Sequence, residues 1–363
     1  MSRRGNVLLR ISERILAFAA VVCFAGAFLE TVSRVIHLGR YPLLPYYFDA
    51  SVARLPANRD MKVSFYGGLA HRFVTDSGGA RIADPSMAKT NSPNGVFAIG
   101  DSQALGYTVD FKQAFPSLVA ASLTGDSSNA RILAAPAVTP EDFPSMLRDY
   151  GHARAGVIHQ KLFIAVINLG NDLDEIYEEG LNPSPVRTSD RERFLISNSF
   201  TYMDWVLLRS HRLINSNEPM GIDPILYMLD PDERIVLARE VADNLDSFLK
   251  TVDVAGQNKL IVIIPSDFQV DRREFLKYRR YYRSTASFES WDKRVPAFEE
   301  MMNSIESYMA DRLTGRGYEV VRFSQLDGIH DSEVFDESSH HLNATGHGLL
   351  AAGILRALDK KHG

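Results

Sequence analysis

The chain has 363 residues, with 40 Lys and Arg against 45 Asp and Glu, a hydrophobic fraction of 45% and a charged fraction of 23%. This is ordinary globular composition, which excludes a largely disordered chain. The net charge of −5 argues against a nucleic-acid binder with a basic surface. The one cysteine excludes an internal disulfide and a zinc site built from several cysteines.

The N-terminus has the order of a secretory signal, because four arginines in the first 14 residues precede an uncharged run over residues 15–29. Cleavage at Ala25-Gly26-Ala27 and an uncleaved anchor are the two interpretations. An apolar pattern interrupted by Glu30, Arg34 and His37 continues to Leu38, and the helical pattern runs through the candidate cleavage site without a break, which favours the anchor. The basic side of such a helix faces the cytoplasm. We therefore expect residues 1–38 to hold the protein in a bacterial inner membrane as a single-pass anchor, with the rest in the periplasm.

Residues 39–94, which we name the connecting segment, contain several prolines and two short expected strands, at 63–66 and 72–74. From Gly95 onward, apolar runs alternate with helical patterns, which predicts a parallel sheet covered on both faces. Strands are expected at 96–99, 131–134, 162–167, 260–264 and 318–323, and helices at 115–123, 141–150, 233–251, 297–313 and 346–358. The rhythm breaks over residues 178–232, which we interpret as an insertion within a domain spanning 95–363.

Gly100-Asp101-Ser102-Gln103 directly follows a buried strand. Ligands bind at the carboxyl ends of parallel strands, so a serine at the start of the next helix is expected to be exposed at that edge as a candidate nucleophile. Gly100 would permit the tight turn. The structural alternative is a helix N-cap serine.

Two further polar runs follow the same logic. Asn168-Leu169-Gly170-Asn171-Asp172 ends the most apolar strand, so a side-chain amide there can donate to an oxyanion, or the run can simply form a turn. In the run over residues 336–347, a carboxylate shortly before a histidine can supply an oriented general base. The alternatives there are a polar surface loop or a metal site of His340, His341 and His347.

The three runs together resemble the blocks of the SGNH (GDSL-like) hydrolase family. Gly100-Asp101-Ser102 looks like the first block, Asn171-Asp172 is similar to the Asn-Asp block, and His341-Leu342-Asn343 looks like the last. The resemblance covers about residue 95 to the C-terminus. It implies an α/β fold, a flavodoxin-like three-layer α/β/α sandwich with a parallel sheet, and serine-dependent cleavage or transfer of an acyl ester without a cofactor or metal.

Carried over by position, the resemblance implies Ser102 as nucleophile, His341 as base, and Asn171 with the Ser102 backbone N–H as the oxyanion hole. Two departures stand out. The family's Asp three residues before the His is Ser338 here, which leaves Asp336 as the orienting carboxylate. The glycine-bearing second block falls on Ala134-Ala135-Pro136-Ala137, where the N–H of Ala137 can still donate. An altered loop can restore the Asp–His pair, or the aspartate is weakened.

A basic and aromatic run over residues 272–283 includes Arg279, Arg280, Tyr281 and Tyr282. It suits an anionic or sugar-rich polymer or lipid headgroups, or it is a solvated helix with its tyrosines on the core. Three functions follow from the sequence: an esterase acting on an acylated glycan or lipid, with acetyl the simplest group; an O-acyltransferase (O-acetyltransferase) on an exported polysaccharide, working with export or acylation partners; and an inactive glycan-binding or scaffold relative. No nucleic-acid partner is expected.

Overall fold

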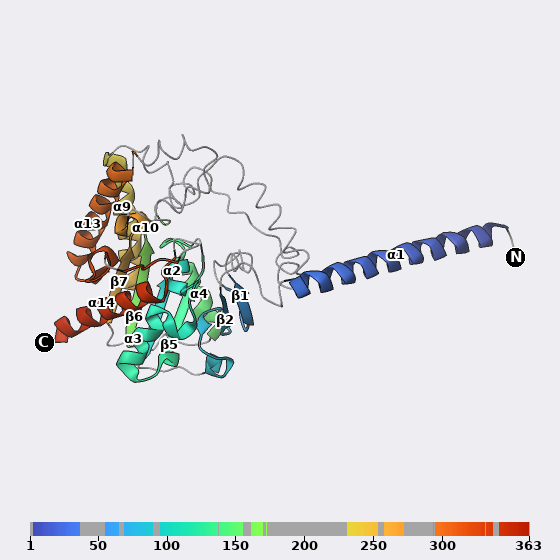
Figure 1. The fold of residues 1–363 in the computed structure, drawn as a ribbon, viewed down its shortest axis with the longest axis horizontal. Helices are drawn as coiled ribbons and strands as arrows, with labels where there is room; N and C mark the ends of the chain where they lie inside the picture. The colour runs from blue at the N-terminus through green and yellow to red at the C-terminus, as the bar shows by residue number, and fades with distance from the viewer. Residues whose placement is uncertain are drawn as a thin grey trace.

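A single central sheet organises the computed structural model of this chain (Figure 1). The structure describes residues 3–36, 55–64, 69–89, 95–136, 138–154, 161–169, 172, 231–252, 258–271, 293, 295–330, 332–336 and 341–362. Within these residues the strand order across the sheet is β1-β2-β3-β5-β4-β6-β7-β8. The strands are β1 (Asp60–Ser64), β2 (Ala70–Thr75), β3 (Arg81–Ile82), β4 (Val96–Gly100), β5 (Ala130–Ala134), β6 (Leu162–Asn168), β7 (Asn258–Ile264) and β8 (Glu319–Arg322).

The five strands from β4 to β8 are parallel to their neighbours. Numbered by their own chain order, they lie as 2-1-3-4-5, which is the flavodoxin-like order of a doubly wound sheet. The predicted fold class is therefore confirmed. All five expected strands of this region are present, with ends that differ by one or two residues from the prediction.

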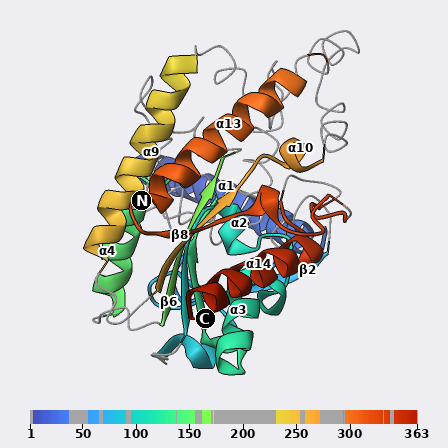
Figure 2. The same ribbon diagram turned by 90° about the vertical axis from the view of Figure 1, so that its left-hand side faces the viewer.

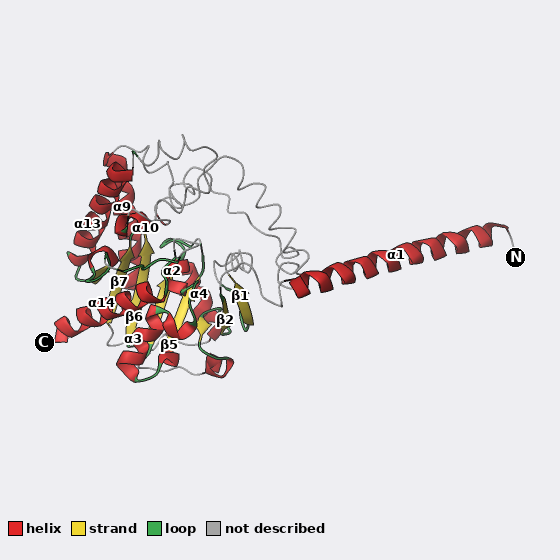
Figure 3. Ribbon diagram, viewed as in Figure 1, coloured by secondary structure: helices red, strands yellow, loops and turns green. Residues whose placement is uncertain are grey.

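Helices cover both faces of the sheet (Figures 2 and 3). One face packs against α4 (Phe143–Arg154), α9 (Pro231–Thr251) and α13 (Val295–Thr314). The other face packs against α2 (Ser102–Leu105), α3 (Phe115–Thr124) and α14 (Ala344–His362). The short helices are α10 (Asp267–Val270) and the 3-10 turns η2 (Pro85–Lys89), η3 (Phe111–Gln113), η4 (Ser127–Asn129) and η6 (Phe323–Gln325).

The parallel strands are apolar along their whole length because each faces a helical layer on both sides. In β4, Val96 and Ala98 pack in the α3 and α14 layer, whereas Phe97 and Ile99 pack in the α9 and α13 layer. Successive side chains of a strand point to opposite faces, so this split is the two-residue period of the strand.

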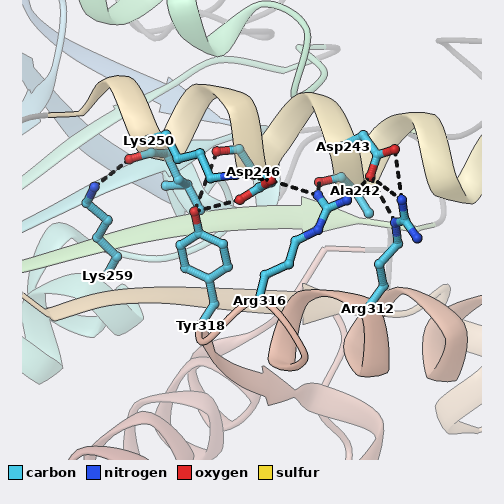
Figure 4. A network of polar contacts seen from close by, with 9 residues as sticks. Ala242, Asp243, Asp246, Lys250, Lys259, Arg312, Arg316 and Tyr318 are labelled. Atoms are coloured by element: carbon cyan, nitrogen blue, oxygen red, sulfur yellow. Dashed lines mark hydrogen bonds and ion pairs between the residues drawn. The ribbon is translucent and has the colours of Figure 1, made fainter.

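In helix α9, Leu237, Val241, Leu245 and Leu249 are buried, whereas Val236 is 44% exposed. A polar network fastens α9 to the end of α13 (Figure 4). Asp243 accepts two hydrogen bonds from Arg312, at 2.8 and 3.0 Å, and Asp246 pairs with Arg316 at 2.9 Å. Partial burial, with the hydrogen bond to Asp246, raises the pKa of Tyr318 to about 12.

The connecting segment contributes its own strands to the same sheet. β1 pairs antiparallel with β2, β2 with β3, and β3 with β5 of the parallel set. Leu55, Met61, Val63 and Phe73 are buried in the same core as α2 and α3. The sheet therefore crosses residue 95, and the boundary between 94 and 95 stays a prediction.

The N-terminal helix α1 (Arg3–Ile36) stands apart from the sheet (Figure 1). Its 23-residue segment Arg14–Ile36 contains an apolar, exposed stretch and is long enough to cross a membrane. The helix continues through Ala25-Gly26-Ala27 without interruption. Its length and composition fit a single-pass anchor or a signal sequence.

Candidate active site

Ser102 begins the one-turn helix α2 at the carboxyl end of β4. β4 lies between β5 and β6, and the chain leaves it toward β5 and returns to β6 on the other side. Such a reversal is the switch point at which doubly wound sheets bind their ligands. Gly100 lets the strands approach closely here, because a Cβ on it would lie 2.8 Å from the Cβ atoms of both Ala104 and Val166. The close approach, and not a positive φ, explains this glycine.

The carboxylate of Asp101 ties the ends of β4 and β6 together. Asp101 caps α2 by accepting a hydrogen bond from the backbone N–H of Gln103 at 2.9 Å. Its other oxygen accepts from the side-chain amide of Asn168 at 2.7 Å, and the Ser102 hydroxyl lies 3.5 Å from the same oxygen. The amide of Asn168 is thus used to hold the turn that carries Ser102.

Ser102 is only 2% exposed, so the expectation of an exposed serine was wrong. On the same helix turn, Gln103 accepts a hydrogen bond from the backbone N–H of Leu342, the residue after His341. Helix α2 also has only four residues, so few peptide dipoles add up at its start. Electrostatic support for a charge on the Ser102 oxygen therefore has to come from individual N–H groups in a site from which bulk water is largely excluded.

The segment that carries His341 is fastened to the segment that carries Ser102. The backbone N–H of Leu342 donates to the side-chain oxygen of Gln103 at 3.0 Å, and its carbonyl accepts from the hydroxyl of Thr108 at 2.7 Å. The rings of Tyr107 and His341 lie 5.2 Å apart. The N–H and the carbonyl of Leu342, the residue after His341, are thus both bound by residues that follow Ser102 closely in the chain.

Asp336 and His341 face each other across a short antiparallel pairing. Phe335 and Leu342 form the bridge, and the N–H of Asp336 donates to the carbonyl of His341 at 2.8 Å. Residues directly opposite in such a pairing carry their side chains on the same face, with Cβ atoms about 5 Å apart. Asp336 and His341 therefore occupy directly opposite positions of this pairing, although the family spacing between the aspartate and the histidine is not kept.

His347 is a core residue. It lies on α14, is 1% exposed, and stacks on Phe115 with ring centroids 5.9 Å apart. The N–H of Phe115 points to its Nδ1 at 3.4 Å. Burial, followed by the nearby positive charge of Arg81, lowers the pKa of His347 to about 3. The neutral ring is packed as part of the core, on Phe115.

This burial predicts an acid sensitivity. Below the ordinary histidine pKa of about 6.5 the unfolded chain takes up a proton that folded His347 refuses, so the stabilisation present above pH 6.5 is lost as the pH falls toward 3. Relative to His347→Gln, we expect the wild type to lose about 1.4 kcal/mol of unfolding free energy per pH unit below 6.5. Denaturant unfolding of both proteins at pH 7.5 and 4.5 measures this.

The matched control for this prediction is His152→Gln. His152 is exposed on α4, so its replacement is expected to leave the pH dependence of unfolding as in the wild type. An identical dependence in the wild type and in His347→Gln would contradict the assignment of His347 as a buried neutral ring.

A second prediction concerns the bond between Asn168 and Asp101. Asn168→Asp would place two buried carboxylates about 3 Å apart, so the folded pKa of one of them rises. We expect a loss of about 3 kcal/mol of unfolding free energy at pH 8, which shrinks toward pH 5 as one carboxyl gains a proton. Asn244→Asp is the control, because Asn244 makes a similar 3.0 Å bond to Glu141 on the surface. Its expected cost is under about 0.5 kcal/mol, and equal losses in the two variants would refute a special role for the Asn168 bond.

Several predicted site residues lie outside the described residues. They are Asn171 and Ala137 of the expected oxyanion hole, His340, and the four residues Arg279, Arg280, Tyr281 and Tyr282. Among the residues that the structure does describe, no three His, Cys, Asp or Glu side chains gather where they could hold a metal ion.

Sequence reasoning missed three residues of the site: Asp101, Gln103 and Asn168. Each lies within a run that the sequence singles out but receives no role of its own there, and each is at most 3% exposed. A buried polar side chain needs a partner, so three polar residues at the ends of buried strands were themselves a signal of a local network. What the sequence could not show is which partner each one takes.

The chain matches no protein-family model and no curated protein. It is similar to several solved structures. An extracellular lipase from Streptomyces rimosus aligns at 14% identity over 74% of this chain and 99% of its own, with a TM-score of 0.37. Phospholipase A1 from Streptomyces albidoflavus aligns at 14% identity over 74% and 100%, with a TM-score of 0.35. A GDSL-like lipase from Bacteroides thetaiotaomicron aligns at 11% identity over 74% and 89%, with a TM-score of 0.34.

The resemblance to SGNH hydrolases extends from the sequence blocks to the fold, because the strand order and the position of Gly100-Asp101-Ser102 are those that the resemblance implies. The chain thus has the doubly wound α/β fold that the resemblance implies.

Proposed function

We propose that this protein is a serine-dependent acyl-ester hydrolase. One observation carries the proposal: the peptide groups of Leu342, next to His341, are both hydrogen-bonded to the segment that starts with Ser102, at the switch point of the sheet. This arrangement holds a candidate nucleophile and a candidate base at one place, although they are 239 residues apart. Nucleophile and base held together in this way form the core of an acyl-transfer site.

In the proposed mechanism, the Ser102 hydroxyl attacks the carbonyl carbon of the ester while His341 takes its proton. The tetrahedral oxyanion is held by the N–H of Ser102 and by the amide of Asn171, with the N–H of Ala137 as a further donor. The intermediate collapses, the proton on His341 passes to the leaving alcohol, and an acyl-serine remains. Water then attacks that ester with His341 again as base, which releases the acid and restores the serine. Asp336 orients His341 in each step, and the chemistry needs no cofactor.

The proposed substrate is an acylated glycan or lipid outside the cytoplasm, with acetyl as the simplest acyl group. The support for this location is α1, whose basic start and apolar continuation fit an inner-membrane anchor with the catalytic domain in the periplasm. The basic and aromatic run with Arg279, Arg280, Tyr281 and Tyr282 is proposed to contact such a substrate, since these residue types suit sugars and anionic headgroups.

The full chain in detergent tests the proposal with p-nitrophenyl esters of increasing acyl length. We expect turnover that is fastest with acetate and falls as the chain lengthens. Adding an oligosaccharide separates the two reactions: acyl transfer to the sugar faster than release to water would identify an O-acyltransferase instead. Absence of turnover with every ester, together with binding to the oligosaccharide, would identify a binding protein that keeps the fold.

A further inference from the structure

The most unusual side chain outside the proposed triad is Arg81. It lies on β3, in the connecting segment, and its exposed fraction is zero. A fully buried arginine is rare because its charge loses the solvation of water. Burial lowers the pKa of Arg81 to about 9, with the Asp110 carboxylate opposing that effect, so the guanidinium is still charged at neutral pH.

The guanidinium of Arg81 binds the backbone directly behind Ser102. One terminal nitrogen, Nη1, donates to the carbonyls of Leu105 and Gly106, both at 2.7 Å, and the other, Nη2, donates to the carbonyl of Val109 at 2.8 Å. The planar group lies over the ring of Phe73, 3.8 Å from its centroid. Three carbonyls of one short segment are thus held by one planar fork, which is the geometry that arginine supplies and lysine does not.

These carbonyls lie at the end of α2 and in the turn after it, where the N–H of Val109 also donates to the carbonyl of Gly106 at 3.3 Å. The last carbonyls of any helix have no partner within it, and α2 is a single turn, which is too short to be stable by itself. Gly106 ends α2 with a φ of +67°, which turns the chain sharply, and a Cβ there would lie 2.8 Å from the Cβ of Ala114 and 3.3 Å from Nη1 of Arg81. The turn is therefore built around the guanidinium.

The same segment carries the contacts that hold His341. Gln103 lies on α2 and Thr108 lies between the carbonyls of Gly106 and Val109, and these two residues bind the N–H and the carbonyl of Leu342. Holding the backbone of residues 105–109 in place therefore also helps to hold Gln103 and Thr108, the two residues that bind Leu342. Asp101 holds the start of α2, and Arg81 holds its end.

We infer that Arg81 is a positioning residue of the site: from the connecting segment it sets the geometry of Ser102 relative to His341 through the backbone of residues 105–109. This inference rests on the proposed function. It also gives the antiparallel strands before residue 95 a part in catalysis.

Arg131 is a matched control. It lies on β5, which pairs with β3, it is 3% exposed, and it too donates to three backbone carbonyls, those of Met87, Ser128 and Ala130. None of these carbonyls belongs to the segment behind Ser102. Replacement of either arginine is expected to lower stability, but only replacement of Arg81 is expected to lower kcat.

The experiment compares Arg81→Lys, Arg81→Met, Arg131→Lys and Arg131→Met in the full chain in detergent, at a temperature where each is folded by circular dichroism. We expect Arg81→Met to lower kcat about 100-fold with KM within about threefold, the signature of a misplaced reacting group. Arg81→Lys keeps the charge without the planar guanidinium, and its kcat is expected to fall about tenfold. This variant replaces Arg81→Met in the comparison if Arg81→Met does not fold. Both Arg131 variants are expected to keep kcat within about twofold while their Tm falls.

Amide hydrogen exchange gives a readout that does not depend on activity. The Leu342 amide is protected by its bond to Gln103, so we expect its exchange to rise at least tenfold in the Arg81 variants and to stay as in the wild type in the Arg131 variants. Unchanged exchange at Leu342 in a folded Arg81 variant, or equal losses of kcat in the Arg81 and Arg131 pairs, would overturn the inference. If the wild type hydrolyses no ester, the proposed function fails, and exchange at Leu342 still decides whether Arg81 positions this segment.

Discussion

Ser102→Ala is expected to lower kcat for p-nitrophenyl acetate at least about 10³-fold, with an unchanged Tm. The large effect follows from the mechanism, because every turnover passes through an ester of this hydroxyl and alanine has no atom to form it. The small effect on stability follows from the contacts. The Ser102 hydroxyl lies 3.5 Å from Asp101, which is at the limit of a hydrogen bond, and the cap of α2 is made by Asp101.

Ser117→Ala is the matched control, because Ser117 is a fully buried serine on α3, in the same helical layer. It should keep activity within about twofold. A fluorophosphonate, which bonds covalently to an activated serine and releases fluoride, should label the wild type and Ser117→Ala but not Ser102→Ala. Full activity in Ser102→Ala would contradict both proposed reactions, ester hydrolysis and acyl transfer, because both pass through an ester of Ser102.

His341→Gln is expected to lower kcat at least about 10³-fold, while His340→Gln keeps kcat within about threefold. The two substitutions are chemically identical and one residue apart, so any general cost of changing this segment is shared. His341 is followed by a residue whose N–H and carbonyl are both bound to the segment of Ser102, and His341 lies directly opposite Asp336.

Steady-state kinetics from pH 5 to 9 check the prediction for His341 and His340. In the wild type the rise of kcat/KM with pH reports the ionisation of the base, and we expect this limb to be absent in the residual activity of His341→Gln. Loss of activity in His340→Gln with retention in His341→Gln would transfer the role of base to His340.

The parallel part of the fold could be predicted from the sequence because each of its strands is buried on both faces. Runs such as residues 162–167 have no polar alternation, and their spacing by helical patterns leaves little choice of architecture. The antiparallel additions were harder. β3 has only two residues, and its pairing with β5 depends on contacts far away in the chain. No local period of hydrophobicity can show such a pairing.

The candidate site was predictable as a set of blocks but not as a set of contacts. Asn168 illustrates the difference, since the sequence places an amide at the end of β6, but only the structure shows that it binds Asp101. His347 illustrates it too: next to His340 and His341 it reads as part of one cluster, yet the helical turn of α14 points it into the core beside Phe115.

The direction of β1 has a consequence for where the protein meets its substrate. β1 runs antiparallel to β2, β2 to β3 and β3 to β5, so β1 runs opposite to β4. The chain coming from α1 therefore reaches the sheet from the side on which β4 ends and Ser102 begins. With α1 held in a bilayer, the first strand of the sheet would begin at the end at which Ser102 lies. Esters carried at or near the membrane surface are then met at a high local concentration, as with any two reactants held on one tether.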